Sequence, residues 1–364
     1  MRIGLIAPPF IPVPPVSYGG TELFIAHLAV GLKKLGHDVV VYTNGESTVP
    51  VERKWLYEDS EWPIKGEVHG SLRDINHCAW AIADAQRDCD ILHLNNAPGL
   101  VYSRLVPQPF VYTIHHPYEE ALSEFYRYYH DVTYVTISNF QRFRETMPRI
   151  TTVHHGLNLS KYRLTTEKQP YLAFIGRIAA VKGTHLAIAV AKKAGIPLKI
   201  AGEIQPLHQA YFDAEVKPHL DGKFIEYVGE ANLEDKNELL GNAMAMLFPI
   251  QWDEPFGLVT IEAMACGTPV LALPGGSVPE IVEDGVSGRV CKTVYEMADY
   301  AAKLDQYNAA DIRAYAEKKF SLDRMVRDYA AIYEKVLAGL PVTEELPAGV
   351  PVTEEEVIQH RAIA

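Results

Sequence analysis

The sequence predicts an α/β protein with two doubly wound domains that face a central cleft. The chain has 364 residues, more than the roughly 100 to 200 residues of a single domain. Short apolar, β-branched runs alternate with amphipathic stretches, as in parallel sheets that helices cover on both faces. This alternation begins again after the polar stretch at residues 160–170. The second half of the chain is therefore expected to repeat the architecture of the first.

The first domain is expected to span residues 1–160. Its apolar run at 2–7, its amphipathic segment at 21–35 and its β-branched run at 38–43 predict one strand–helix–strand unit. The remaining elements expected here are strands at 90–94, 110–114, 133–137 and 150–154, and helices at 71–86, 119–129 and 139–146.

The second domain is expected to span residues 161–318. Its expected elements are strands at 171–175, 198–201, 224–228, 245–248 and 269–272, and helices at 183–194, 207–217, 233–242 and 258–265. A further helix is expected at 322–337. Residues 339–364 contain Pro-Val-Thr-Glu-Glu twice, and their prolines and acids predict a mobile tail without a core of its own.

Composition excludes several classes of protein. A hydrophobic fraction of 48% with 22% charged residues is typical of a soluble globular protein, and no apolar run approaches the roughly 18 residues that span a bilayer. The formal net charge of -12 argues against a nucleic-acid partner. It also disfavours membrane association without excluding it, because the basic residues Arg142, Arg144 and Arg149 form only a sparse set.

The N-terminal residues and the cysteines bear on the cellular compartment and on the redox state of the thiols. The apolar start of the chain is broken by proline too early for a signal peptide, so a cytoplasmic location is expected. The four cysteines, at positions 78, 89, 266 and 291, show no C-x-x-C spacing and no clustering with histidine. We therefore expect reduced, mostly buried thiols and neither a zinc site nor a disulfide framework.

Two carboxylates frame the start of a short predicted helix. Pro255 and Gly257 prevent a helix from running through Glu254, whereas residues 258–265, which include Glu262, have helical composition. The free N–H groups at that helix N-terminus can bind a phosphate, and the carboxylates can accept hydrogen bonds from hydroxyls on either side. A nucleotide sugar fits this arrangement, because its anionic diphosphate lies between two groups that carry hydroxyls.

This segment resembles the E-x7-E motif of the retaining glycosyltransferases of the GT4 type, whose fold is GT-B. The residues between and after the two glutamates also match, as far as the segment 274–282. The resemblance covers both domains, from Gly19 to Gly288. It implies two Rossmann-like domains, the first on the acceptor side and the second binding the nucleotide sugar. It also implies that a terminal helix, residues 319–338, crosses back to the first domain.

A glycine pair, Gly19 and Gly20, lies between the proline-rich loop after the first strand and the first helix. Glycines at this place permit close approach of the backbone to a ligand. The spacing is not that of the G-x-G-x-x-G fingerprint, which disfavours a nicotinamide-dependent reaction. Similarity to GT4 enzymes, which carry a Gly-Gly loop here, implies that this loop approaches the donor.

Two other predicted strands end in residues that can carry chemistry. His115 follows the strand at 110–114, and the resemblance implies that it reaches the donor sugar, with His116 as the fallback. Arg177 and Lys182 follow the strand at 171–175 in a pattern similar to the G-R-x4-K-G segment of GT4 enzymes. Two cations at the mouth of a crevice can neutralise a diphosphate as it leaves, in place of a metal.

The resemblance, with these motifs, therefore implies a specific set of site residues. Glu262 is expected to accept hydrogen bonds from the ribose, and Glu254 to contact hydroxyls of the transferred sugar. The expected catalytic residues are His115, Arg177, Lys182 and Glu254. The expected donor-binding residues are Gly19, Gly20, Phe256, Gly257, Leu258, Val259, Thr260 and Glu262. No D-x-D pair follows a predicted strand, so neither a metal nor a cofactor is expected.

One segment departs from the family pattern. Where many relatives have Asn-Gly-Val-Asp at the domain junction, this chain has His155, Gly156, Leu157 and Asn158. The departure leaves the glycine as the turn and predicts a hinge.

The leading hypothesis is a retaining glycosyltransferase that moves a hexose, with glucose as the preferred assignment, from a UDP-linked donor to an unidentified saccharide or small-molecule acceptor. UDP is preferred to GDP or ADP on family frequency alone. The alternatives are a GDP-mannose-dependent mannosyltransferase, a non-catalytic nucleotide-sugar-binding module and a nucleotide-sugar epimerase. Polysaccharide, lipid-linked and small aromatic or heterocyclic acceptors all stay open, as does the oligomeric state.

Overall fold

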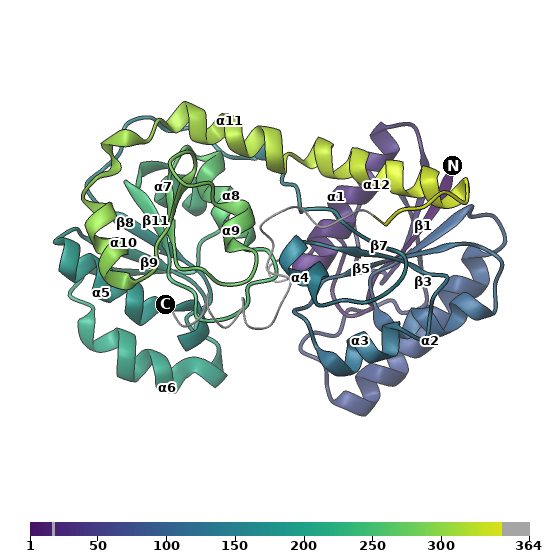
Figure 1. Cartoon of the computed structure of the whole chain (residues 1–364). Helices are drawn as coiled ribbons and strands as arrows, with labels where there is room; N and C mark the ends of the chain where they lie inside the picture. The colour runs from purple at the N-terminus through teal and green to yellow at the C-terminus, as the bar shows by residue number, and fades with distance from the viewer. Residues whose placement is uncertain (17–18, 344–364) are drawn as a thin grey trace. The chain divides into compact units, whose positions relative to one another are not determined.

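The computed structural model describes residues 1–16 and 19–343. Contacts within the chain divide these residues into two units (Figure 1). The first unit contains Met1–Gly156 and the described residues from Leu322 onward, and the second contains Leu157–Ser321. The predicted mobile tail falls mostly on residues 344–364, which lie outside the described residues.

Within its described residues, the first unit contains a seven-stranded parallel sheet in the order β3-β2-β1-β4-β5-β6-β7. The order reverses direction between β1 and β4, which makes the sheet doubly wound. Its strands are β1 (Arg2–Ile6), β2 (Asp38–Thr43), β3 (Glu52–Trp55), β4 (Ile91–Leu94), β5 (Phe110–Ile114), β6 (Thr133–Thr136) and β7 (Ile150–Thr152).

Helices cover both faces of this sheet. Helices α1 (Gly20–Lys34) and α12 (Leu322–Leu337) pack together over one face, where their apolar residues share a core with β1 and β2. The other core lies beneath α2 (Glu67–Ala85) and α3 (Glu120–Tyr126). The two remaining helices are the 3-10 helix η1 (Ala97–Arg104) and α4 (Asn139–Phe143). The last helix among the described residues is therefore part of the first unit.

The second unit contains a six-stranded parallel sheet, again among the described residues, in the order β10-β9-β8-β11-β12-β13. This order also reverses direction after the first strand of the unit, between β8 and β11. The strands are β8 (Leu172–Ile175), β9 (Leu198–Ala201), β10 (Ile225–Gly229), β11 (Ala245–Phe248), β12 (Val270–Ala272) and β13 (Gly288–Val290).

The helices of the second unit include two that frame the loops discussed below. Helix α5 (Thr184–Ala194) follows β8, and α8 (Leu258–Ala265) follows β11. The others are α6 (Gln209–Tyr211), α7 (Leu233–Asn242), α9 (Val278–Ile281), α10 (Val294–Ala301) and α11 (Ala309–Phe320). Short 3-10 turns lie at η2 (Leu159–Lys161), η3 (Ala180–Lys182), η4 (Pro206–His208), η6 (Lys217–His219) and η7 (Leu304–Gln306).

The prediction of two doubly wound α/β domains is confirmed, but several elements differ. No element was predicted at β3, β13, α9, α10 or α11. The strand β3 has the polar sequence Glu-Arg-Lys-Trp, which lacks a strand pattern, and it forms through pairing with β2 at the sheet edge. The continuous helix expected at 207–217 is instead broken into α6 and the π-helical turn η5 (Phe212–Val216). Pro218 lies two residues after η5, within the 3-10 turn η6 (Lys217–His219), and it cannot donate a helical hydrogen bond because it has no N–H.

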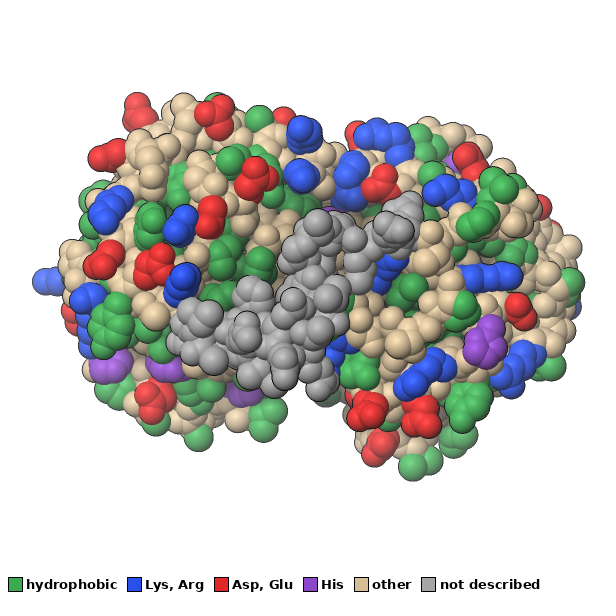
Figure 2. Space-filling model, in the orientation of Figure 1, with side chains coloured by type: hydrophobic (Ala, Val, Ile, Leu, Met, Phe, Trp, Pro, Cys, Tyr) green, Lys and Arg blue, Asp and Glu red, His purple; other side chains and the backbone are tan. Residues whose placement is uncertain are grey.

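No helix among the described residues has the length and apolar character needed to cross a membrane. On the face shown in Figure 2, the acidic and basic side chains are interspersed, without a continuous basic area. The described part of the chain also contains no group of three or more His, Cys, Asp or Glu side chains that is arranged to hold a metal ion.

Candidate functional site

The strand order of the second unit brings two predicted segments to one edge of its sheet. Parallel α/β sheets bind ligands at the carboxyl ends of the strands, where the strand order reverses. In this unit β8 and β11 are the neighbouring strands at the reversal. Lys182 follows β8 and Glu254 follows β11, so the topology places a cation and a carboxylate at the predicted ligand-binding edge.

Lys182 and Glu254 form an ion pair at this edge. The Lys182 ammonium lies 2.6 Å from Glu254 Oε2, and the two side chains are only 17% and 10% exposed. An ion pair so far removed from water is screened less than a surface pair. Backbone bonding joins the two loops as well, since the Gln251 N–H donates to the Val181 carbonyl at 2.8 Å.

A glycine-rich turn supports the backbone of Glu254. The Ser277 N–H donates to the Glu254 carbonyl at 2.9 Å. Gly276 has φ +60°, and a Cβ there would lie 2.2 Å from the Glu254 carbonyl oxygen. A side chain at this position would therefore collide with the Glu254 backbone. The Pro-Gly-Gly-Ser segment that extends the sequence motif is thus part of the structure that positions Glu254.

Gly257 begins helix α8 in a left-handed conformation, with φ 80°. The carbonyl of Gly257 accepts hydrogen bonds from the Thr260 N–H at 3.0 Å and from the Thr260 hydroxyl at 2.8 Å. The first-turn amides of a helix have no intrahelical acceptor, and the Thr260 amide is engaged locally. Of the predicted phosphate-binding amides, those of Leu258 and Val259 are the better placed to bind an anion.

Phe256 contributes its backbone to the same loop, while its side chain belongs to the core. The side chain is 2% exposed, and its ring packs edge-on against Phe320 at a centroid distance of 6.0 Å. This burial anchors the loop between Glu254 and helix α8.

Glu262 lies on α8 with its carboxylate held at one oxygen. Its Oε1 accepts hydrogen bonds from the Tyr162 hydroxyl and from the Lys236 ammonium, both at 2.9 Å. Burial, and then the adjacent carboxylate, raise the pKa of Tyr162, so its hydroxyl keeps the proton that it donates. The other oxygen, Oε2, is buried and has no hydrogen-bond partner among the described residues. A buried oxygen of this kind fits a ligand hydroxyl.

Arg177 lies apart from the ion pair. Its guanidinium is half-buried, and it contacts the Gln205 side chain in the loop after β9 at 3.4 Å. Glu254 and Glu262 likewise have separate partners. The structure therefore brings Lys182 and Glu254 into direct contact. Arg177 lies in the loop after β8, and Glu262 lies on α8, which follows the loop that carries Glu254.

The predicted glycine pair lies in the first unit, at the start of α1. Gly19 is the N-cap residue with φ 147°, and a Cβ there would lie 2.8 Å from Pro15 and 2.9 Å from the Glu22 carboxylate. Gly20 is exposed, and a Cβ there would meet no atom of the described residues within 4 Å. The backbone at Gly20 is therefore open to a ligand, whereas Gly19 fits a crowded turn.

His115 follows β5 in the first unit and is held by Asn95, which follows β4. The His115 Nε2 lies 2.9 Å from Asn95 Oδ1, and the Asn95 amide donates to the Ile6 carbonyl at 3.2 Å. Asn95 Oδ1 must therefore accept the Nε2–H of His115. Burial lowers the pKa of His115 well below its usual value. The ring is thus neutral, with Nδ1 as an acceptor suited to a hydroxyl.

His116, the fallback residue, has both ring nitrogens engaged. Its Nδ1 donates to the Pro117 carbonyl and its Nε2 bonds to the Tyr126 hydroxyl, each at 2.6 Å. These contacts give His116 a role in the structure of the first unit. His115 is accordingly the better candidate for a ligand.

The sequence interpretation missed the residues that orient the predicted ones. Trp252 directly contacts Glu254, and Asn95 directly contacts His115. Asn95 was detectable, because it follows a predicted strand directly. The other missed residues, Tyr162 and Lys236, come from a turn and from α7, and nothing local in the sequence links them to Glu262.

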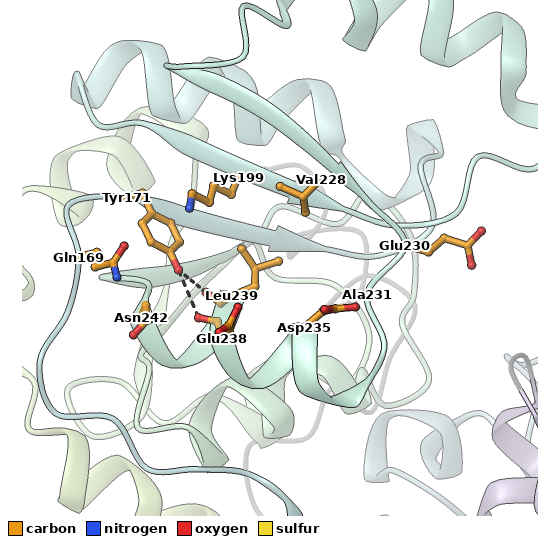
Figure 3. A pocket seen from close by; sticks show the side chains of 10 residues that line it. All are labelled: Gln169, Tyr171, Lys199, Val228, Glu230, Ala231, Asp235, Glu238, Leu239 and Asn242. Atoms are coloured by element: carbon orange, nitrogen blue, oxygen red, sulfur yellow. Dashed lines mark hydrogen bonds between the residues drawn. The ribbon is translucent and has the colours of Figure 1, made fainter.

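A separate hollow of about 430 Å³ lies beside α7 in the second unit. Figure 3 shows the hydroxyl of Tyr171 bonded to the carbonyls of Glu238 and Leu239 at 3.4 and 3.0 Å. The lining residues are Gln169, Tyr171, Lys199, Val228, Glu230, Ala231, Asp235, Glu238, Leu239 and Asn242. None of the predicted site residues lines this hollow, so the site is assigned to the loops after β8 and β11.

Comparison with known families matches nearly the whole described chain. The model "Glycosyltransferase Family 4" matches residues 18–161, and the model "Glycosyl transferases group 1" matches residues 159–318. The two matches overlap at residues 159–161, shortly after the boundary between the two units at residues 156 and 157. Together they include every predicted site residue.

Individual proteins show the same similarity. A glycogen synthase of Mycobacterium tuberculosis is 26% identical over 376 residues, covering 84% of this chain and 87% of the relative. The crystal structure of AviGT4, a glycosyltransferase involved in avilamycin A biosynthesis, has a TM-score of 0.70 at 24% identity and covers 93% and 98% of the two chains. That of Anabaena Alr3699/HepE in complex with UDP and glucose has a TM-score of 0.71 at 17% identity and covers 92% and 100%.

Proposed function

We propose that this chain, which belongs to the GT4-type glycosyltransferases of GT-B fold, transfers a hexose from a nucleotide sugar to an acceptor with retention of anomeric configuration. We assign the donor as UDP-linked and the hexose as glucose. The acceptor is a saccharide or a small molecule. The observation that carries the proposal is the meeting of Lys182 with Glu254 beside the start of α8, at the strand-order reversal of the second unit.

The donor nucleotide is assigned to the second unit. The first-turn amides of Leu258 and Val259 bind the diphosphate, because a helix N-terminus favours an anion. Glu262 accepts from the ribose hydroxyls through its buried Oε2, which has no partner among the described residues. Tyr162 and Lys236 hold the opposite oxygen, which leaves Oε2 oriented for the ligand.

Stabilisation of the negative charge on the leaving group is assigned to Arg177 and Lys182. The bond between the anomeric carbon and the phosphate oxygen breaks as the acceptor hydroxyl attacks from the same face, and the acceptor proton passes to the leaving phosphate. Preorganised cations stabilise the developing phosphate charge. These two cations supply that stabilisation without a metal, so we propose that the reaction needs neither a metal nor a cofactor.

The transferred sugar is assigned to Glu254, and in the first unit to His115. A carboxylate accepts hydrogen bonds from sugar hydroxyls, and the Nδ1 of the neutral His115 ring does the same. The choice of UDP and glucose is supported by one structural neighbour, whose crystal structure contains UDP and glucose.

A ligand screen tests this proposal. Calorimetry and thermal shift are measured with UDP-glucose, UDP-GlcNAc, GDP-mannose, ADP-glucose and NAD, because a ligand that binds only the folded state raises the melting temperature. We expect binding of UDP-glucose and slow donor hydrolysis that EDTA leaves unchanged. Preference for GDP-mannose would replace the donor assignment with that of a mannosyltransferase. Binding without hydrolysis or transfer would indicate a non-catalytic module, and a response to NAD alone would contradict the proposal.

A further inference from the structure

Trp252 contacts both members of the ion pair at the candidate site. Its indole Nε1–H donates to Glu254 Oε2 at 2.9 Å. The same oxygen lies 2.6 Å from the Lys182 ammonium, and this ammonium lies 4.5 Å from the centre of the Trp252 ring. One side chain therefore binds the carboxylate through its N–H and the cation through its ring face.

These two contacts restrict groups that are otherwise adaptable. A lysine carries its charge on a flexible four-carbon stem, and an aromatic face attracts the ammonium most strongly when water is partly excluded. The pair is only 17% and 10% exposed. The indole N–H in turn makes a charge-assisted hydrogen bond, which is stronger than a bond between neutral groups.

Lys182 and Trp252 both donate to Glu254 Oε2, and this sharing determines how the ion pair can respond when a phosphate binds. Lys182 has three N–H donors, so its ammonium can turn toward a phosphate oxygen while Glu254 keeps the indole bond. Without that bond, Glu254 would depend on the same ammonium that the phosphate attracts. The two tasks, binding phosphate and holding the carboxylate, are thus divided between Lys182 and Trp252.

We propose that Trp252 is a positioning residue that keeps Glu254 oriented toward the donor sugar while Lys182 binds the donor phosphate. This inference rests on the proposed function, in which these two residues contact the sugar and the diphosphate. It predicts a role in recognition of the sugar and none in recognition of the nucleotide, because the ribose contact is assigned to Glu262 and the diphosphate contacts to Lys182, Arg177 and the start of α8.

Two substitutions separate the N–H from the ring. Trp252→Phe keeps an aromatic face for Lys182 and removes the donor to Glu254. Trp252→Leu removes both. We expect kcat/KM for donor hydrolysis to fall about tenfold in Trp252→Phe, since losing a hydrogen bond to a charged group has at least this effect. A larger loss is expected in Trp252→Leu. Affinity for free UDP should stay within twofold of the wild type in Trp252→Phe.

The matched control is Trp55→Phe, at a partly exposed tryptophan of β3 in the first unit, which should leave both kcat/KM for donor hydrolysis and affinity for free UDP unchanged. A double-mutant cycle with Glu254→Gln adds a second measurement. Because Trp252 acts through Glu254, the effect of Trp252→Phe should shrink at least threefold in the Glu254→Gln background.

The outcomes distinguish this inference from the proposed function. A wild-type chain that binds no UDP-glucose would overturn both. Normal wild-type binding with Trp252→Phe indistinguishable from Trp55→Phe would overturn the positioning role alone. An equal loss of affinity for UDP and for UDP-glucose in Trp252→Phe would also overturn it, because that result indicates a general distortion of the unit.

Discussion

His93 on β4 and Tyr333 on α12, 240 residues apart in sequence, share a buried hydrogen bond of 2.6 Å between Nδ1 and the phenol hydroxyl. The other nitrogen of His93 bonds to the Thr113 hydroxyl at 2.8 Å, and Thr113 bonds to Tyr329 at 3.0 Å. These four side chains form one polar network beneath α12. The network fixes the terminal helix on the first unit and explains how a histidine can be buried completely.

Buried histidines of the first unit predict a loss of stability in mild acid. Burial lowers the pKa of His93 and of His155 to about 3. In the unfolded chain these groups titrate near pH 6.5, so below that pH the unfolded chain binds more protons. The contribution of these histidines to the free energy of unfolding is complete above pH 6.5. It is lost as the pH falls from 6.5 toward 3, at about 1.4 kcal/mol per pH unit for each histidine.

Denaturant unfolding at pH 7.5, 6.5, 5.5 and 4.5 measures this slope. His93→Gln should lower the slope of the unfolding free energy against pH by the equivalent of about one proton taken up on unfolding. His130→Gln, at an exposed histidine of the same unit, should leave this slope unchanged. A free energy of unfolding that stays constant down to pH 4.5 would show that the histidines gain charge in the folded state.

The buried Glu22 carboxyl predicts the opposite pH dependence of the free energy of unfolding. This carboxyl is 5% exposed in the first turn of α1, and burial raises its pKa to about 7. Its contribution is complete below pH 4.5 and is lost as the pH rises through 7. Glu22→Gln should therefore be more stable than the wild type at pH 8, by up to about 3 kcal/mol, and nearly equal to it at pH 5. The same difference at both values would contradict the assignment.

Gly31 predicts a steric coupling between α1 and α12. A Cβ at Gly31 would lie 2.3 Å from a methyl group of Val326. Gly31→Ala should lower the free energy of unfolding by about 1–3 kcal/mol through overpacking, despite the better helix propensity of alanine. Adding Val326→Ala makes room and should recover part of the loss in chemical denaturation. Equal stability of Gly31→Ala and the wild type would show that the helices move apart freely.

Lys182→Ala should reduce donor turnover at least tenfold, because it removes a cation assigned to the leaving diphosphate. Circular dichroism should show an intact fold. Lys217→Ala provides the control, since its ammonium is 65% exposed and bonds only to Asp213 among the described residues. Turnover unchanged at saturating donor would remove Lys182 from the catalytic residues.

Glu262→Gln should weaken UDP binding about tenfold, because a neutral amide accepts more weakly than a carboxylate. Isothermal calorimetry measures the dissociation constant. Tyr162→Phe is the companion variant: it removes one bond to Oε1 and should have a smaller effect of the same sign. A Glu262→Gln chain with wild-type affinity for UDP would rule out the ribose contact.

Elements with strong local signals were predictable. The helices at 258–265 and 322–337 have the bounds that their sequences indicate, because apolar periodicity and flanking Pro or Gly residues act over a few residues. The strand β3 and the interrupted helix near 207–217 were not predictable, since pairing with β2 and a π turn override local preference there.

The sequence by itself determined the family and the two doubly wound sheets, because turn residues and hydrophobic periods are encoded within short segments. It also predicted Glu254, Glu262 and Lys182 as site residues. Only the tertiary structure decided that Trp252 touches both Glu254 and Lys182, and that Tyr162 supports Glu262 across 100 residues of sequence. Such contacts depend on strand order and on loop packing, which bring distant residues together without leaving a local pattern.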